Sequence, residues 1–306
     1  MTTDANRVTF GVKTSQAGVG YEEILRFWRE ADALPAFEHA WLWDHLVPMR
    51  GDVRGPALEA WTLLAALAAQ TTRLRLGVIV TSNRIRPPAL LAKMAATVDI
   101  VAGGRLDFGI GVGGSLVPDT AVVEGVRREY EAYGVEVVAV RDAVAALGEA
   151  CTIFKRMWTE TDPFDFAGRH YQLTGAICEP KPIQRPGPPI LIGAGGERAA
   201  LRVVAEHADI WNAPVRTTEE FRHKSRVLDD YCATVGRDPA EIVRSKQLLV
   251  NAADPSAPEA AQEALLELID AGARHLVLAP FPPLPPAAWL ADEIVEPVLE
   301  RVAARA

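Results

Sequence analysis

A chain of 306 residues, 49% of them apolar, is long enough to bury one large core or the cores of two ordinary domains. Its 32 basic residues are spread along the chain and outnumbered by 40 acidic ones, so the net charge of −8 argues against nucleic acid and anionic membranes as partners. No apolar run approaches the roughly 20 residues that span a bilayer, and the first residues lack an export-signal pattern, so we expect a cytoplasmic protein.

Strands and helices alternate along the chain, as apolar periodicity and glycine or proline breaks indicate. The predicted strands are Val8–Lys13, His39–Trp43, Leu74–Val80, Leu106–Gly111, Pro189–Ile192, Asp209–Asn212, Val243–Val250 and His275–Ala279. A helix is predicted after each strand. Two stretches interrupt the alternation: Gly113–Val138, with a short helix around Glu124–Tyr133, and Thr159–Pro188, whose alternation predicts a small β-hairpin.

Eight strand–helix pairs predict an α/β fold, a single (β/α)₈ TIM barrel that covers residues 1–306. The insertions would lie after the fourth strand, at about 113–138, and before the fifth strand, at about 159–188. Two doubly wound domains are the alternative. They would need a linker near Thr159–Pro188, where Phe164, Phe166 and Tyr171 indicate packed rather than linking chain. We therefore predict one barrel.

In such a barrel the active site lies at the carboxyl ends of the strands. These ends are polar or rich in glycine, but they hold no nucleophile elbow, no zinc-binding motif, no phosphate loop ending in Gly-Lys-Ser/Thr and no evident carboxylate pair. Lys13, at the end of the first strand, could form a Schiff base, but a solvated or ion-paired lysine is the expected state. A site with few reactive side chains indicates a bound cofactor that brings its own reactivity.

The fifth predicted strand runs directly into Gly195 and Gly196, and a helix is expected from Glu197 to His207. Glycines let backbone N–H groups approach a ligand, and a helix N-terminus favours negative charge, so this stretch predicts a phosphate site. Gly109, Gly111 and Gly114 also match the dinucleotide fingerprint Gly-x-Gly-x-x-Gly. A proline follows closely and argues against the immediate helix that this fingerprint requires.

Four stretches of the chain carry a joint pattern, together with Glu129-Tyr130-x-x-Tyr133-Gly134: His39–Leu46, Thr81–Asp99, Gly103–Gly114 and Pro180–Asn212. In this order they resemble the bacterial-luciferase-like flavin and deazaflavin oxidoreductases. The Asp-His pair at Asp44 and His45 is similar to that of the members that use coenzyme F420. The resemblance implies a TIM barrel, a small-molecule substrate, no metal and a homodimer.

For individual residues, the resemblance implies that His45 and Asp44 are catalytic, with Asp44 a hydrogen-bonding partner of the deazaflavin. Glu129 and Tyr130 would belong to a lid over the cofactor, and Gly195, Gly196 and Glu197 would hold its phosphate. The full set of implied cofactor-binding residues is Asp44, His45, Val80, Thr81, Ser82, Gly111, Gly113, Glu129, Tyr130, Ala194, Gly195, Gly196, Glu197 and Asn212.

Gly114 departs from the pattern, because sugar-phosphate-oxidising members hold a proton-donating glutamate there. This departure leaves His45, with Tyr130 or Glu129, to handle protons. The alternatives to these catalytic roles are that Asp44 caps the loop after the second strand and that His45 is a structural residue. The function implied is an F420-dependent oxidoreductase that transfers a hydride to or from a small organic substrate. An FMN-dependent monooxygenase fed by a separate reductase and a non-catalytic flavin-binding relative are the alternatives.

Overall fold

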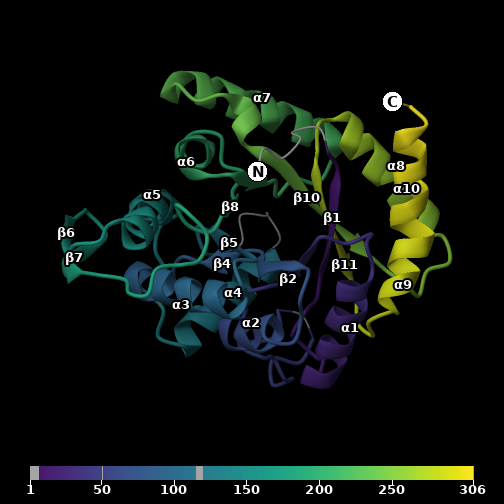
Figure 1. Ribbon diagram of the computed structural model, residues 1–306, viewed down its shortest axis with the longest axis horizontal. Helices are drawn as coiled ribbons and strands as arrows, with labels where there is room; N and C mark the ends of the chain where they lie inside the picture. Colours follow the sequence, from purple (N-terminus) through teal and green to yellow (C-terminus); the bar gives the residue numbers. More distant parts are fainter. Residues whose placement is uncertain (1–6, 50, 115–119, 306) are drawn as a thin grey trace.

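Parallel strands form a closed barrel in the computed structural model, which describes residues 7–49, 51–114 and 120–305 (Figure 1). The barrel strands are β1 (Thr9–Lys13), β2 (His39–Leu42), β3 (Arg75–Val78), β5 (Leu106–Gly111), β8 (Ile190–Gly193), β9 (Ile210–Asn212), β10 (Val243–Val250) and β11 (His275–Pro280). Hydrogen bonds link them in the order β3-β2-β1-β11-β10-β9-β8-β5, and pairing of β3 with β5 closes the ring. The predicted TIM barrel is confirmed.

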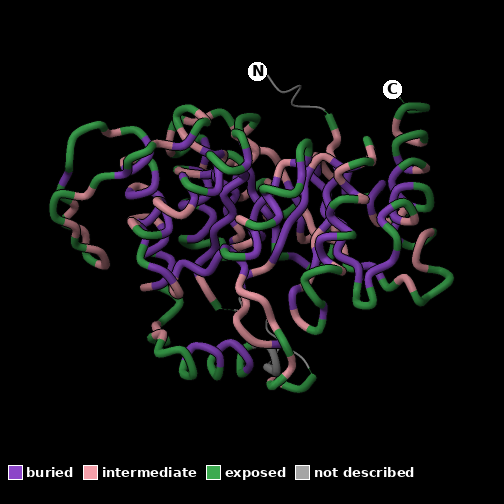
Figure 2. The backbone as a smooth tube through the Cα atoms, turned by 60° about the horizontal axis from the view of Figure 1, so that its bottom comes forward, coloured by how far each residue is buried: buried purple, intermediate pink, exposed green. Residues whose placement is uncertain are grey.

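Helices surround this barrel with their buried faces toward the strands, except α4, whose Val126 and Tyr130 pack against the loop after β2 (Figures 1 and 2). They are α1 (Tyr21–Ala33), α2 (Ala60–Ala68), α3 (Pro88–Val101), α4 (Thr120–Ala132), α5 (Val140–Thr159), α6 (Ala200–His207), α7 (Thr218–Val235), α8 (Ala257–Asp270), α9 (Ala287–Leu290) and α10 (Glu296–Ala303). A 3₁₀ helix, η1 (Pro239–Glu241), precedes β10, and a π-helix, η2 (Ala291–Val295), joins α9 to α10. None of the helices described is both long and apolar enough to cross a bilayer.

The amphipathic pattern of each helix explains how it packs. In α1, Ile24, Phe27 and Trp28 are fully buried, whereas Glu22 in the first turn is exposed. Inside the barrel, Trp41 forms a small apolar cluster with residues of β8, β9 and β11. A Cβ on Gly77 would lie 2.6 Å from the Trp41 ring, so the glycine makes room for this large side chain.

The third strand is shorter than predicted. It ends at Val78 rather than Val80, a cis peptide joins Ile79 to Val80, and the chain then forms the short strand β4 (Thr81–Ser82) beside β5. Val80 is therefore in a turn at the carboxyl end of the barrel instead of in the strand.

The helix after the fifth barrel strand begins at Ala200, so the expectation that it begins at Glu197 is wrong. Residues 196–199 are exposed, whereas Ala200 and Leu201 are buried. Helical order starts where the apolar face first meets the core, because tertiary packing supplies most of a short helix's stability.

Both predicted insertions contain the elements expected of them. The hairpin in 159–188 is confirmed: β6 (Phe164–Ala167) and β7 (Gln172–Ala176) pair antiparallel outside the barrel. The helix in the other insertion is α4, longer than expected. Residues 115–119 of that insertion, including the proline considered above, lie outside the described residues.

Candidate active site

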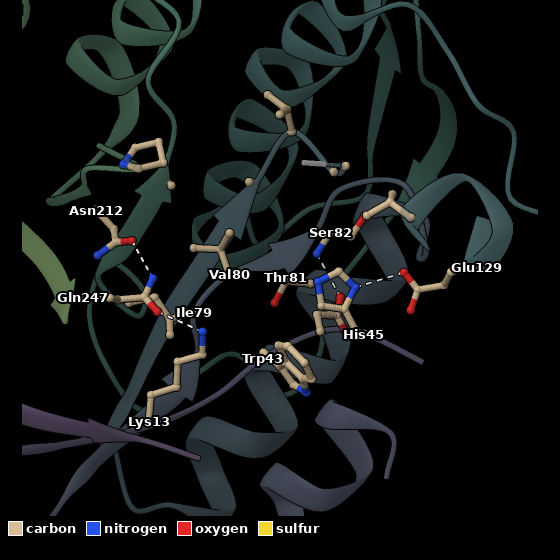
Figure 3. A pocket seen from close by; sticks show the side chains of 18 of the residues that line it. Lys13, Trp43, His45, Ile79, Val80, Thr81, Ser82, Glu129, Asn212 and Gln247 are labelled. Atoms are coloured by element: carbon tan, nitrogen blue, oxygen red, sulfur yellow. Dashed lines mark hydrogen bonds and ion pairs between the residues drawn. The ribbon is translucent and has the colours of Figure 1, made fainter. Parts of the chain in front are cut away.

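A partly open cavity of about 300 Å³ lies at the carboxyl ends of the barrel strands (Figure 3). The predicted cofactor-binding residues that line it are Asp44, His45, Val80, Thr81, Ser82, Gly111, Gly113, Glu129, Tyr130 and Asn212. The lining does not include Ala194, Gly195, Gly196 or Glu197, although Gly193 belongs to it. The remaining lining residues are Lys13, Trp43, Ile79, Val112, Gly114, Val126, Pro214 and Gln247.

His45 is held in one orientation by a buried carboxylate. Its Nδ1 lies 3.0 Å from Oε2 of Glu129, whose side chain is 0% exposed. Oε1 of Glu129 accepts hydrogen bonds from the backbone N–H of Leu46 and, at 3.4 Å, of Val47. Because a carboxylate only accepts, it fixes the proton of His45 on Nδ1 and leaves Nε2 for the cavity. Trp43 supports the imidazole edge to face, with 5.0 Å between ring centroids.

Asp44 is buried in a bidentate ion pair. Arg86 donates to both of its oxygens, at 2.8 and 2.9 Å, and the backbone N–H of Ser82 donates to Oδ2 at 2.9 Å. Arg86 also contacts Glu59, the N-cap of α2. Burial lowers the pKa of Arg86, but the hydrogen bonds and charge of Asp44 outweigh burial and raise it overall. Asp44 thus anchors the end of β2 to β4 and Arg86.

The hydroxyl groups near Asp44 are also paired. Ser82 Oγ lies 2.7 Å from the Tyr130 hydroxyl, and Thr81 accepts a hydrogen bond from the Trp61 indole at 3.2 Å. Burial is the main cause that raises the pKa of Tyr130, so the phenol stays protonated near neutral pH. Gly113 has φ +79°, and a Cβ there would come within 2.7 Å of Ser82 Oγ and 2.8 Å of the Tyr130 hydroxyl. Only glycine fits at this position.

Val80 forms an apolar floor for the cavity. A Cβ on Gly111 would lie 2.7 Å from one Val80 methyl group, and a Cβ on Gly193 would lie 2.9 Å from the other. Two glycines on neighbouring strands therefore leave the space that the valine side chain occupies. The result is a smooth apolar surface at the centre of the strand ends, suited to a planar ring.

The two glycines of the predicted phosphate stretch serve different needs. Gly195 is a packing glycine, because a Cβ there would lie 2.9 Å from Pro214. A Cβ on Gly196 would meet nothing closer than Ala200 at 3.5 Å, so packing does not explain the absence of a side chain. Lys224 of α7 donates to the Gly195 carbonyl at 2.6 Å and lies 3.5 Å from Glu197. The sequence pattern contains no signal for this lysine, which comes from a helix 29 residues later.

Lys13 makes no ion pair with the residues that the structure describes. It is half-buried, and Nζ donates to Oε1 of Gln247 at 2.9 Å. Burial first, and then the charge of Lys246, lower the pKa of Lys13 to about 8. The polar partner is an amide from β10, a strand that the sequence places more than 200 residues away, which is why no local pattern revealed it.

Within the described part of the chain, no three His, Cys, Asp or Glu side chains gather as a metal site. The site offers one histidine with a free ring nitrogen, a set of fixed hydrogen-bond donors and acceptors, and an apolar floor.

Residues 6–296 match the model of the luciferase-like monooxygenase family. An F420-dependent glucose-6-phosphate dehydrogenase of Kineococcus radiotolerans is 35% identical over 160 residues, which cover 52% of this chain and 43% of that protein. The pyrimidine monooxygenase RutA of Rhizobium rhizogenes is 30% identical over 208 residues, 66% of this chain and 49% of that protein. The chain spans about half the length of the curated relatives it matches.

The fold of an F420-dependent secondary alcohol dehydrogenase, solved with an F420–acetone adduct, superposes with a TM-score of 0.80 at 17% identity. The superposition covers 96% of this chain and 99% of that chain, and it agrees with the barrel described above. The family match spans nearly the whole sequence. The chain therefore belongs to the luciferase-like monooxygenase family.

Proposed function

We propose that this protein is an F420-dependent oxidoreductase that transfers a hydride between the deazaflavin and a small organic substrate. The observation that carries the proposal is the His45–Glu129 pair at the edge of a cavity with an apolar floor. A hydride that reaches a carbonyl, imine or activated alkene leaves negative charge on the substrate, and a positioned proton must meet that charge. The names of two F420-dependent dehydrogenases among the relatives and structural neighbours support the same cofactor.

The residues present fit a deazaflavin. Val80, with Gly111 and Gly193 behind it, provides an apolar surface for the ring system. Gly196 lacks a side chain without a packing reason, and Lys224 contacts the residues on both sides of it, Gly195 and Glu197. The backbone of Gly196 and the ammonium can therefore approach a phosphate once the exposed Glu197 turns away. When bound, the deazaflavin would supply the hydride chemistry.

In this proposal His45 holds a proton at Nε2, beside the substrate atom on which negative charge develops. Glu129 keeps the other ring nitrogen protonated and stabilises the positive charge of the imidazolium form. Tyr130 stays a neutral phenol that orders Ser82. Gly114 lines the cavity but has no side chain, so His45 is the residue left to donate.

Titration of the purified protein with F420 and with FMN, followed by fluorescence, tests the proposal. We expect F420 to bind with a micromolar or lower Kd, roughly −8 kcal/mol, and FMN to bind at least about tenfold more weakly. His45→Ala and His45→Gln should each lower turnover by about 10² to 10⁴ with only a few-fold change in cofactor affinity. Near-wild-type turnover in both variants would make His45 structural.

A flavin-dependent monooxygenase is the second candidate, and the 30% identity to the pyrimidine monooxygenase favours it. Preferential binding of FMN with oxygen consumption would support this candidate over F420 chemistry. Absence of turnover with either cofactor, across enones, imines and nitro compounds, would favour the non-catalytic relative. The homodimer and the cytoplasmic location stay predictions; light scattering tests the former.

A further inference from the structure

The cavity has a second polar side that the proposed hydride chemistry does not use. Lys13 projects into it from the end of β1, and its Nζ lies 5.8 Å from the centroid of the Trp43 ring. Figure 3 shows Lys13 and Gln247 on one side of Trp43 and His45 on the other. A ligand that reaches from Lys13 to His45 would therefore pass along the indole.

Lys13 has no counterion among the residues that the structure describes. The two carboxylates of the cavity lining are both engaged elsewhere, Asp44 by Arg86 and Glu129 by His45 and backbone N–H groups. Among the described residues, Lys13 has one polar partner, the neutral amide of Gln247. With its pKa at about 8, Lys13 still carries its charge for most of the time at neutral pH. A half-buried cation without a counterion favours a ligand that brings one.

A chain of hydrogen bonds fixes the amide that contacts Lys13. Gln247 Nε2 donates to Asn212 Oδ1 at 2.8 Å, and Asn212 Nδ2 donates to Ser245 Oγ at 3.0 Å. Ser245 Oγ lies 2.7 Å from Nδ1 of the buried His275. Because the Gln247 NH₂ group donates to Asn212, the Gln247 oxygen faces Lys13 and accepts a hydrogen bond from one of its three N–H groups. Two N–H bonds of Lys13 remain for a ligand.

We propose that Lys13 anchors a carboxylate of the substrate, which places the reacting carbon at His45. This inference rests on the proposed function and names the substrate class: small carboxylic acids that carry a carbonyl, imine or alkene. A carboxylate fits better than a phosphate, because Lys13 is the one lysine or arginine among the described residues that line the cavity. Arg86, a buried cation next to the lining residue Asp44, is already paired with Asp44 and Glu59.

Isothermal titration calorimetry tests the assignment with acetate, pivalate and benzoate as probes, each beside its neutral amide, on protein with and without F420. At least one carboxylate should bind about tenfold or more tightly than its amide, because a charge-assisted hydrogen bond replaces a neutral one. Above pH 8 its affinity should fall as Lys13 loses its proton. If no carboxylate binds more tightly than its amide, the proposal is overturned.

Two matched variants separate this role from a general charge effect. Lys13→Met should abolish the preference for the carboxylate and leave amide and F420 affinities within about threefold. Lys246→Met removes the neighbouring charge on β10 from a residue outside the cavity lining, and it should keep the preference. Equal effects of both variants would overturn the proposal. A large loss of F420 affinity in Lys13→Met, with no loss of carboxylate preference, would assign Lys13 to the cofactor and overturn it too.

The outcomes for the two proposals are distinguishable. If wild-type protein does not bind F420, the proposed function fails, whereas carboxylate preference in the cofactor-free protein still reports on Lys13. If F420 binds and supports turnover of neutral substrates only, the proposed function stands and the role of Lys13 fails.

Discussion

Glu129→Gln is the substitution that most directly tests how His45 works. The side chain of Glu129 is fully buried, and its two oxygens serve three donors: Nδ1 of His45 and the backbone N–H groups of Leu46 and Val47. Glutamine has the same shape but only one acceptor oxygen. If that oxygen stays with the two backbone donors, the new NH₂ group faces Nδ1 of His45. The imidazole must then accept at Nδ1 and carry its proton on Nε2.

With Nδ1 accepting from the NH₂ group, His45 cannot become the imidazolium that donates from Nε2 without breaking this hydrogen bond. The imidazolium also loses its neighbouring negative charge. Removal of a partner that orients a reactive side chain typically costs 10- to 100-fold, and up to about 10⁴ where the wrong histidine tautomer results. We expect turnover to fall about 100-fold or more. Loss of charge-assisted hydrogen bonds should lower the free energy of unfolding by about 1–3 kcal/mol.

The assay combines turnover with F420, cofactor Kd and ¹⁵N NMR of the histidine side chains, whose shifts distinguish the two tautomers. Glu131→Gln is the matched control: it lies on the same helix, α4, but pairs only with Arg127 on the surface. A folded Glu129→Gln protein with turnover within about threefold of wild type, or with an unchanged His45 tautomer, would refute the reasoning.

Three further predictions follow from the geometry. Gly196→Asp should weaken cofactor binding about tenfold or more, roughly 1.4 kcal/mol, with unchanged circular dichroism; unchanged affinity in fluorescence titration would place the phosphate elsewhere. Gly113→Ala should lower the free energy of unfolding in urea by roughly 2 kcal/mol, because its Cβ would lie 2.5 Å from Arg84 and 2.7 Å from Ser82 at φ +79°; a change below about 0.5 kcal/mol would contradict this. Burial is the main cause that lowers the pKa of His207 to about 4, so the folded state binds fewer protons than the unfolded state between about pH 4 and 6.5 and loses stability as pH falls through that window. His207→Gln should therefore have a flatter dependence of Tm on pH there, whereas parallel curves for the two proteins would count against the assignment.

The barrel could be predicted because its signals are local. Each strand is a short apolar run, and each following helix repeats its apolar residues at helical spacing. The number of strand–helix pairs was therefore enough to predict the barrel. The start of α6 could not be predicted, because glycine and exposed residues precede it and only packing decides where helical order begins. The turn at Val80 was missed for a similar reason: its place depends on Gly193, a residue on a strand far away in sequence.

The candidate site divides in the same way. Asp44 and His45 could be assigned to the cavity from their positions in the chain alone, because active sites of TIM barrels lie at the carboxyl ends of the strands. The partners that define their states come from elsewhere: Arg86 lies 42 residues after Asp44, and Glu129 lies 84 residues after His45. The amide partner of Lys13 could not be predicted, because it is 234 residues away. Sequence patterns predict which backbone ends meet, but not which side chains then pair.

The contact of Arg86 with both Asp44 and Glu59 has a consequence for how this sequence can change over time. One positive charge serves two carboxylates, so the three side chains together carry a net charge of −1. Loss of the Asp44 charge leaves a balanced pair, whereas loss of Arg86 first would leave two carboxylates without a cation, one of them buried. Substitution of Asp44 before Arg86 is thus tolerated far more easily than substitution of Arg86 before Asp44. Any redesign of the cavity at Asp44 would have to follow the same order of substitutions.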